Sequence, residues 1–351
     1  MRRISVHAST DYDVLVEHGL LRQCGSLLAG AAVTRHFAIV TDDTVDELYR
    51  KDLLHALDMA GCKAECFVFP HGEASKCSGT LLKLYEFLCE SGITRSDWLI
   101  ALGGGVVGDL TGFAAATFLR GIRYIQIPTT LLAQIDSSVG GKTAINLPGG
   151  KNLVGAFKQP SLVICDPDTL KTLPAHILSD GIAEAIKYGM IRDPGLFALL
   201  DAHNSDNVLP QADEIIARCV TIKRDIVAKD EFDTGERMLL NFGHTLGHAI
   251  ERHSEFAYTH GQAVAAGMCM LSARTAAPAV TARLIGCVSN YGLPTDYDAP
   301  MQELTALCGH DKKRMGSELS YVVCPAIGQG EIRKASFPDF CRMMEESLCT
   351  V

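Results

Sequence analysis

The segment WLIALGGGVVGD, residues 98–109, decides the fold class of this chain of 351 residues. It begins with an apolar run of the length of a buried strand, and its glycines end that run before a helical pattern begins. Similar short apolar runs occur at residues 37–40, 66–69, 124–128 and 162–165, with helical patterns between them. Alternating strands and helices favour a mostly parallel sheet. We therefore predict an α/β domain over residues 1–175.

The pattern changes near residue 175, after which strand-like runs become scarce. Residues 212–229, 237–253 and 260–276 are rich in Ala, Leu, Ile and Met at helical spacing, which predicts a long helix in each. Residues 321–323 are a lone late strand candidate. We therefore predict an all-α domain over residues 176–351 that holds metal and substrate, with ligands in a cleft between the domains.

The composition excludes several classes of protein. A net charge of -9 argues against nucleic-acid binding, because phosphate backbones are bound by clustered Lys and Arg. The 13 cysteines are odd in number and form no CxxC pair, which favours reduced thiols over disulfides. No apolar segment has the length of a signal peptide or a membrane span. We therefore expect a soluble, cytoplasmic enzyme with no membrane partner.

The glycine cluster is predicted to bind a phosphate, because glycines let the backbone approach the ligand and helix N-terminal amides face its charge. Gly103, Gly105 and Gly108 also fit the GxGxxG pattern of Rossmann-like, dinucleotide-binding units. The acidic residue that contacts the ribose is not evident at its usual position in such units. The loop HGEASK, residues 71–76, is a candidate for the missing contacts. A tight turn without a ligand is the alternative interpretation of the glycines.

A second glycine-rich segment, DSSVGGKTAIN, covers residues 136–146. It contains Gly-Gly-Lys-Thr but lacks the first glycine of the GxxxxGK[ST] pattern, which disfavours an NTPase. Lys142 is nevertheless a predicted anion contact, and Lys151 and Asn152 add polar groups to the same region.

Three histidines lie in NFGHTLGH, residues 241–248, and in THG, residues 259–261. His244 and His248 would share one helix face, and neutral imidazole is a common zinc ligand. Glu184 is the best candidate for a further ligand, because its neighbours are Ala and Ile. Two histidines and one glutamate leave an open position on zinc. Any one of these histidines alone would be interpreted as a core residue, and their combination with Glu184 reverses that preference.

Cationic and amide side chains near the histidines predict an anion-binding lining around the metal. These residues are Lys187, Lys223, Arg237 and Asn241. For Lys223 and Arg237 the alternative is an exposed helix cation that pairs with a neighbouring Asp or Glu.

The chain resembles the 3-dehydroquinate synthase family from about Asp42 to Lys313. The resemblance rests on residues 103–109, 120–132, 136–146, 150–153, 183–189 and 240–251. It implies that family's fold, a homodimer, tightly bound NAD, and Zn²⁺ or Co²⁺ bound by Glu184, His244 and His260. The residues implied to bind NAD are Asp42, His71, Gly72, Glu73, Ala74, Ser75, Lys76, Gly105, Val106, Val107, Gly108, Asp109, Thr129, Thr130, Lys142, Lys151, Thr169, Leu170, Lys171 and Thr172.

The same resemblance implies the substrate 3-deoxy-arabino-heptulosonate 7-phosphate. NAD-mediated oxidation, phosphate elimination, reduction and aldol closure would give 3-dehydroquinate, in the shikimate pathway. The implied catalytic residues are His248, Lys187, Asp136 and Lys142. The implied substrate contacts are Asn152, Lys223, Arg237, Asn241, Lys313 as one of the two lysines at 312 and 313, and Arg120, which would reach into the site of the other subunit.

The chain departs from the family at Gln262, where Glu is usual, and we expect this change to tune metal affinity without abolishing binding.

Sister sugar-phosphate cyclases, such as 2-deoxy-scyllo-inosose synthase, would keep NAD and metal but change the substrate. A glycerol dehydrogenase-like enzyme would accumulate NADH. A non-catalytic metal- or phosphate-binding protein would need no dinucleotide loop. The cations predicted to meet a substrate carboxylate favour the dehydroquinate branch.

Overall fold

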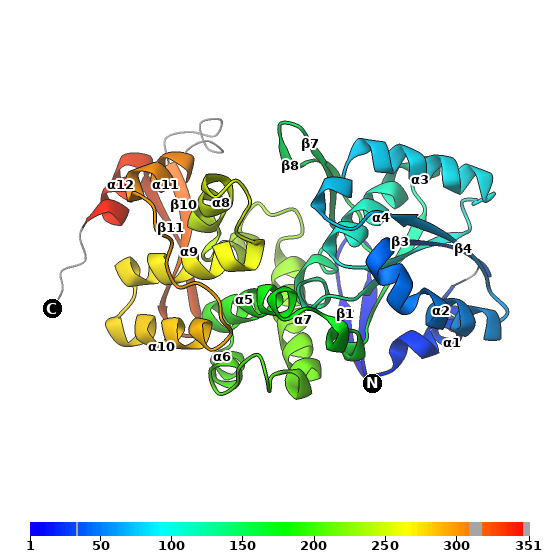
Figure 1. The fold of residues 1–351 in the computed structure, drawn as a ribbon, viewed down its shortest axis with the longest axis horizontal. Helices are drawn as coiled ribbons and strands as arrows, with labels where there is room; N and C mark the ends of the chain where they lie inside the picture. The colour runs from blue at the N-terminus through cyan, green and yellow to red at the C-terminus, as the bar shows by residue number, and fades with distance from the viewer. Residues whose placement is uncertain (33, 309–317, 347–351) are drawn as a thin grey trace. The chain divides into compact units, whose positions relative to one another are not determined.

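The computed structural model describes residues 1–32, 34–308 and 318–346. The chain forms two compact units, coloured from blue to green and from green to red in Figure 1. The first contains Met1–Leu173 and Ala212–Phe232, and the second contains Pro174–Gln211 and Asp233–Val351. None of the described helices is long and apolar enough to cross a membrane.

The first unit is built on a seven-stranded sheet with the order β1-β2-β9-β6-β5-β3-β4. Its strands are β1 (Arg2–Val6), β2 (Tyr12–Val16), β3 (His36–Asp42), β4 (Lys63–Phe69), β5 (Trp98–Gly103), β6 (Arg123–Pro128) and β9 (Leu162–Cys165). All neighbouring pairs are parallel except β1 with β2. The predicted parallel sheet and its five predicted strands are therefore confirmed.

Helices cover both faces of this sheet (Figure 1). On one face, α1 (Leu20–Ala31) and α2 (Asp43–Met59) pack against strand residues that include Phe37 and Ile39. On the other face, α3 (Ser78–Glu90) and α4 (Gly105–Thr117) pack against the alternate residues, such as Ala38 and Val40. Burial of both faces explains why β3 and β5 are continuous apolar runs.

The second glycine-rich segment leads into a hairpin, of which its last residues form part of the first strand. Its strands β7 (Lys142–Leu147) and β8 (Gly150–Phe157) pair antiparallel in a separate two-stranded sheet. Short turns complete the unit: η1 (Glu73–Ser75), η2 (Phe118–Arg120), the π-helical turn η3 (Ala133–Ser137) and η4 (Pro167–Thr172).

The predicted single domain boundary at residue 175 is wrong for α7 (Ala212–Lys229), which belongs to the first unit. This helix contacts β1, β2 and η3. Arg2 on β1 forms ion pairs with Asp213 and Glu214 at the start of α7. The helix itself has the bounds that its sequence predicts, but its apolar side chains are buried in the first unit.

The second unit contains α5 (Ala175–Ile191), α6 (Pro194–Asp201), η5 (Leu209–Gln211), η6 (Glu236–Asn241), α8 (His244–His253), α9 (His260–Thr275), α10 (Pro278–Ser289), α11 (Met301–Cys308) and α12 (Phe337–Glu345). It also contains an antiparallel hairpin of β10 (Glu318–Ala326) and β11 (Gln329–Ser336). The unit is therefore not all-α. The strand candidate at residues 321–323 lies in β10, and β11 lacks an apolar run because most of its residues are at least partly exposed.

One predicted helix is shorter in the structure. The expected helix over residues 237–253 is interrupted at Gly243, which adopts a left-handed conformation with φ 80°. The residues before it form η6, and α8 begins only at His244. Asn241 and His244 therefore do not share one helix face.

Candidate active site

The predicted NAD-binding segments follow the carboxyl ends of five parallel strands. Asp42 ends β3, residues 71–76 follow β4, Gly105 follows β5, Thr129 and Thr130 follow β6, and Thr169–Thr172 lie in η4 after β9. Because the carboxyl ends of parallel strands lie at one edge of a sheet, the fold brings these segments to the edge at which α/β proteins bind ligands.

Lys76 contacts two other predicted site residues at this edge. Its Nζ lies 2.5 Å from Asp109 Oδ2 and 2.6 Å from Asn152 Oδ1, and the lysine is buried. Burial raises the pKa of Asp109, and the ammonium of Lys76 opposes that shift. Asn152, a predicted substrate contact, therefore bonds to the same ammonium as Asp109, and both Lys76 and Asp109 are predicted to contact NAD.

The turn before α4 has the features of a phosphate site. The first amides of the helix have no intrahelical partner, and the N-cap Gly104 has no side chain that could bond to them. A Cβ on Gly105 would lie 3.3 Å from Ser137 Oγ, so the glycine keeps the space above the turn open. The hydroxyls of Thr129 and Ser137 are buried and have no hydrogen-bond partner among the residues that the structure describes. These groups fit the pyrophosphate of a dinucleotide.

Two residues with predicted roles pair with each other in the first unit. Lys223 on α7 forms an ion pair with the carboxylate of Asp136 in η3, and its Nζ donates to the Asp136 carbonyl oxygen at 2.6 Å. Lys223 is 4% exposed and Arg237, in the second unit, is 3% exposed. The alternative interpretation of these two residues as exposed surface cations is therefore wrong.

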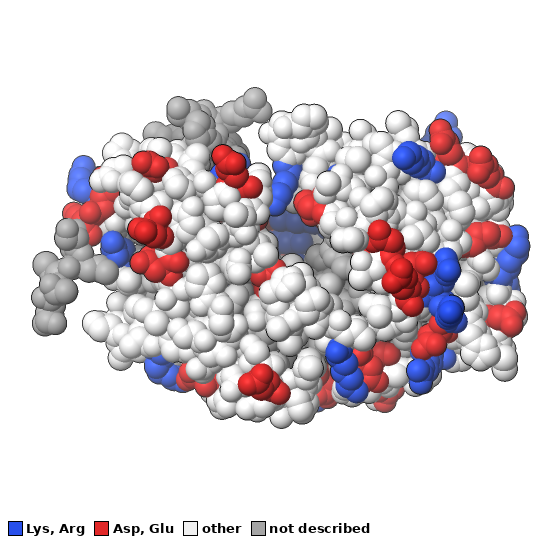
Figure 2. Space-filling model, viewed as in Figure 1, with Lys and Arg blue, Asp and Glu red and all other residues white. Residues whose placement is uncertain are grey.

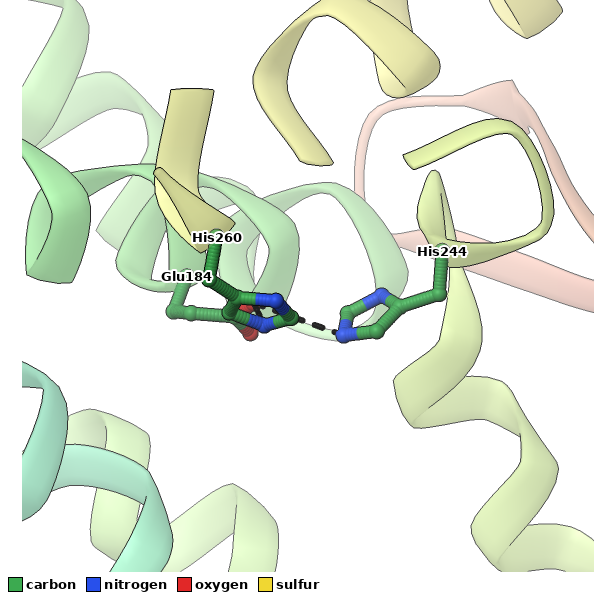
Figure 3. Close-up of side chains that lie close together, drawn as sticks. All are labelled: Glu184, His244 and His260. Atoms are coloured by element: carbon green, nitrogen blue, oxygen red, sulfur yellow. Dashed lines mark ion pairs between the residues drawn. The ribbon is translucent and has the colours of Figure 1, made fainter. Parts of the chain in front are cut away.

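Three potential metal ligands meet in the second unit: Glu184 from α5, His244 from α8 and His260 from α9 (Figure 3). Glu184 Oε1 lies 3.5 Å from His244 Nε2 and 3.3 Å from His260 Nε2. Glu184 is 1% exposed and also forms an ion pair with the buried Lys187. The structure thus places His260 in this group, whereas His248 belongs to a second group with His260 and Glu251.

His244 has the protonation state that a metal ligand needs. Its Nδ1 lies 3.1 Å from the carbonyl oxygen of Phe242. Because a carbonyl oxygen only accepts, Nδ1 carries the hydrogen and Nε2 directs its lone pair towards Glu184. Burial lowers the pKa of His244 to about 3, so the ring is neutral near pH 7.

Two carboxylates raise the pKa of His260. Burial alone would lower its pKa, but the carboxylates of Glu184 and Glu251 outweigh that effect and raise the pKa to about 10. Burial is the largest single effect on this ring, but the hydrogen bonds and charges of the two carboxylates together exceed it. A divalent cation that binds here replaces the proton on this ring. Two imidazole nitrogens and one carboxylate are the donor set of catalytic zinc sites with an open position.

Close packing of α8 on α9 places the two histidines side by side, with ring centroids 5.2 Å apart. A Cβ on Gly267 would lie only 2.3 Å from the Gly243 carbonyl oxygen, so glycine permits the contact. Helix α9 begins with a capping box, in which Thr259 N donates to Gln262 Oε1 at 3.0 Å. Gln262 therefore bonds to the helix end, and the expectation that it tunes the metal by bonding to a ligand finds no support.

Gly261→Ala is expected to lower stability and to weaken metal binding. A Cβ at this position would lie 2.4 Å from Asp180 Cα and 2.6 Å from the Asp180 carbonyl oxygen. Backbone atoms cannot rotate away, so the start of α9 and His260 with it must shift, at a cost of about 1–3 kcal/mol. Urea unfolding and metal titration measure the two effects.

Gly286→Ala in α10 is the matched control, because its Cβ would meet no atom within 4 Å. Alanine in an open helical position should stabilise the protein by up to about 1 kcal/mol. Equal stability and equal metal affinity in the two variants would contradict the packing argument at Gly261.

Several further predicted residues lie on the surface or outside the described residues. Lys142 and Lys151 are exposed on the β7–β8 hairpin, and Arg120 is exposed at the end of η2 with φ 66°. Lys313 lies outside the described residues.

On the face shown in Figure 2, acidic and basic side chains are interspersed.

A cavity of about 150 Å³ in the second unit is lined by Asn241, His244 and His248, together with Arg252. Sequence reasoning missed Arg252. The indication was available, because Arg252 follows His248 by one helical turn in α8 and so lies on the same face.

Two family profiles match the chain, "3-dehydroquinate synthase N-terminal" over residues 66–180 and "3-dehydroquinate synthase C-terminal" over residues 181–314. The 3-dehydroquinate synthase of Streptococcus suis (strain 05ZYH33) is 44% identical over an alignment of 346 residues, and the match covers 96% of this chain and 98% of the relative.

Solved structures of two other synthases share the fold. A 2-deoxy-scyllo-inosose synthase complexed with carbaglucose-6-phosphate, NAD⁺ and Co²⁺ has a TM-score of 0.88 at 23% identity, over 99% of this chain and 100% of that one. A 2-epi-5-epi-valiolone synthase from Streptomyces hygroscopicus subsp. jinggangensis 5008, with NAD⁺ and Zn²⁺ bound, has a TM-score of 0.87 at 27% identity, over 98% and 97%.

Proposed function

The chain belongs to the 3-dehydroquinate synthase family, and we therefore propose that it converts 3-deoxy-arabino-heptulosonate 7-phosphate into 3-dehydroquinate and phosphate. This is a carbon–oxygen lyase reaction of the shikimate pathway. The observation that carries the proposal is the metal-ligand group, in which the Nε2 atoms of His244 and His260 both face the buried carboxylate of Glu184.

The two cofactors are NAD and one divalent cation, Zn²⁺ or Co²⁺. The uncapped start of α4 and the buried hydroxyls at the sheet edge would hold NAD. Glu184, His244 and His260 would hold the cation. When bound, NAD takes up and returns a hydride, and the cation withdraws electron density from a substrate hydroxyl. Related cyclases that hold NAD⁺ with Co²⁺ or Zn²⁺ support this assignment.

The chain's own residues would bind and orient the substrate. We assign the substrate carboxylate to Lys223, Arg237 and Asn241, of which the first two are buried cations. We assign the phosphate to Lys142, Asn152, His248 and Lys313. Lys187, beside Glu184, and Asp136, held by Lys223, would orient substrate hydroxyls. Burial of Lys187 and Lys223 keeps water from competing for their donors.

The reaction is neutral in redox terms, because the hydride removed from the substrate is returned to it before the ring closes. Phosphate leaves with the electron pair of its carbon–oxygen bond, and the proton lost from the neighbouring carbon goes to the departing phosphate or to solvent. The aldol step then joins two carbons of the same molecule. Net NADH formation is therefore not expected.

The assembly and location are also part of the proposal. We propose a homodimer in which Arg120 completes the phosphate site of the other subunit, and the exposure of Arg120 supports this role. A cytoplasmic location is consistent with the free state of the twelve cysteines that the structure describes.

The deciding experiment incubates the metal-loaded protein with catalytic NAD and each of several sugar phosphates, while phosphate, dehydroquinate and NADH are measured. Phosphate and dehydroquinate from 3-deoxy-arabino-heptulosonate 7-phosphate, without NADH accumulation, are expected. Turnover only of sedoheptulose 7-phosphate or glucose 6-phosphate would make the protein a sister cyclase. Steady NADH growth on a polyol would make it a dehydrogenase.

Arg237→Ala is expected to raise the KM for the substrate by roughly 10–100-fold, because a charge-assisted hydrogen bond contributes about 1.5–3 kcal/mol. The turnover number should change less, since the substrate carboxylate does not react. Initial-rate kinetics separate the two constants. Arg283→Ala, which removes an exposed ion pair with Asp201, is the control and should leave both constants unchanged. An unchanged KM in Arg237→Ala would refute the carboxylate assignment.

A further inference from the structure

Glu251 is a buried carboxylate beside a predicted metal ligand. It lies on α8, its side chain is 10% exposed, and its Oε1 is 3.6 Å from Nδ1 of His260. The other ring nitrogen of His260, Nε2, faces Glu184. The His260 ring is therefore placed between two carboxylates, one on each nitrogen.

The two histidines of the candidate metal site have a similar arrangement, with the Nδ1 contact at 3.1 Å for His244 and at 3.6 Å for His260. Each directs Nε2 towards Glu184 and Nδ1 towards an acceptor, which is the Phe242 carbonyl for His244 and the Glu251 carboxylate for His260. An acceptor on the outer nitrogen fixes the tautomer and the ring orientation of a metal-bound histidine. A carboxylate also makes the ring a stronger electron donor than a carbonyl does.

The group of His248, Glu251 and His260 has a second interpretation, as a separate metal site. That site would have to share His260 with the first one. A ring that binds a metal through both nitrogens must lose its remaining N–H, which a neutral imidazole retains near pH 7. His248 is also exposed, and its ring centroid lies 6.2 Å from that of His260. The geometry favours a hydrogen-bond acceptor over a second ligand set.

We infer that Glu251 is a positioning residue, which accepts the Nδ1 hydrogen of His260 and directs Nε2 to the metal. The inference rests on the proposed metal site and is independent of which sugar phosphate is the substrate. Glu251 would act through His260 without touching metal or substrate.

The test is competition between the protein and a chelator for Zn²⁺ and for Co²⁺. Glu251→Ala is expected to weaken metal binding by roughly 10–100-fold, while the stoichiometry stays at one ion per chain. Glu251→Gln should lose less, because its amide oxygen can still accept from Nδ1. The visible absorption of bound Co²⁺ should change shape in Glu251→Ala, and excess metal should restore much of the turnover. If the role of Glu251 were purely structural, the Co²⁺ spectrum would stay unchanged. Glu251→Gln would then bind metal no more tightly than Glu251→Ala.

Glu303→Ala is the matched control, because it removes another carboxylate from a histidine, His253, at 3.1 Å in the same unit. It should bind metal like the unmodified protein. Unchanged affinity in Glu251→Ala would overturn the inference. Two ions in the unmodified protein and one in Glu251→Ala would identify a second metal site instead. Metal binding that does not depend on His244 would mean that the proposed site itself has failed.

Discussion

Replacing His244 with alanine is expected to remove the bound metal and to reduce phosphate release by roughly 10³-fold, because metal catalysis supplies several kcal/mol and each ~1.4 kcal/mol is tenfold. The neutral ring presents Nε2 to Glu184, and its removal leaves one imidazole and one carboxylate as ligands. Metal analysis of the purified variant and a phosphate-release assay measure the two effects.

The same variant allows a rescue experiment. The truncated side chain lies on the wall of the cavity in the second unit, so added imidazole can reach the vacated position. Imidazole should restore part of the metal binding and part of the turnover. His253→Ala is the control, because His253 lies on the same helix and bonds to Tyr297 and Glu303 instead of to the ligand group. A metal-loaded, active His244→Ala protein would remove this residue from the ligand set.

Gly105→Val should weaken NAD binding by roughly 100-fold, because charge-assisted hydrogen bonds worth about 1.5–3 kcal/mol would be lost. The Cβ alone would lie 3.3 Å from Ser137 Oγ, and the two methyl groups would fill the space in front of the helix amides. Turnover at low NAD concentration should fall with the affinity. Calorimetric titration with NAD measures the loss directly.

Gly30→Val is the control for this substitution. Gly30 lies in α1 of the same unit, and a Cβ there would meet no atom within 4 Å. It should bind NAD normally. Thermal unfolding of both variants shows whether Gly105→Val remains folded. A folded Gly105→Val protein with unchanged NAD affinity would place the pyrophosphate elsewhere.

The sheet was predictable because its inner strands are buried on both faces. A strand such as β5, with every residue buried, is a continuous apolar run in the sequence. The strands β1 and β11 escaped prediction because their exposed residues interrupt any such run. The break at Gly243 was missed because helical spacing continues across it, although its left-handed conformation ends the pattern.

The metal group was only partly predictable from the residues themselves. The residue pattern singled out all three histidines and helical spacing paired His244 with His248, whereas the choice of His260 over His248 as a ligand came from the family resemblance. The decisive contact depends on how closely α8 packs on α9, which is set by Gly243 and Gly267 and is not expressed in the spacing of the histidines. The pairing of Asp136 with Lys223 joins residues 87 positions apart and has no local pattern in the sequence.

The path of the chain through its two units constrains how the protein is made. The chain passes from one unit to the other at residues 173–174, 211–212 and 232–233. As the ribosome releases the N-terminus first, the sheet is synthesised well before α7, which contacts β1 and supplies Lys223. The first unit can therefore be completed only after residue 232 has emerged, and a nascent chain that stalls at residue 173 would expose the surface that α7 covers.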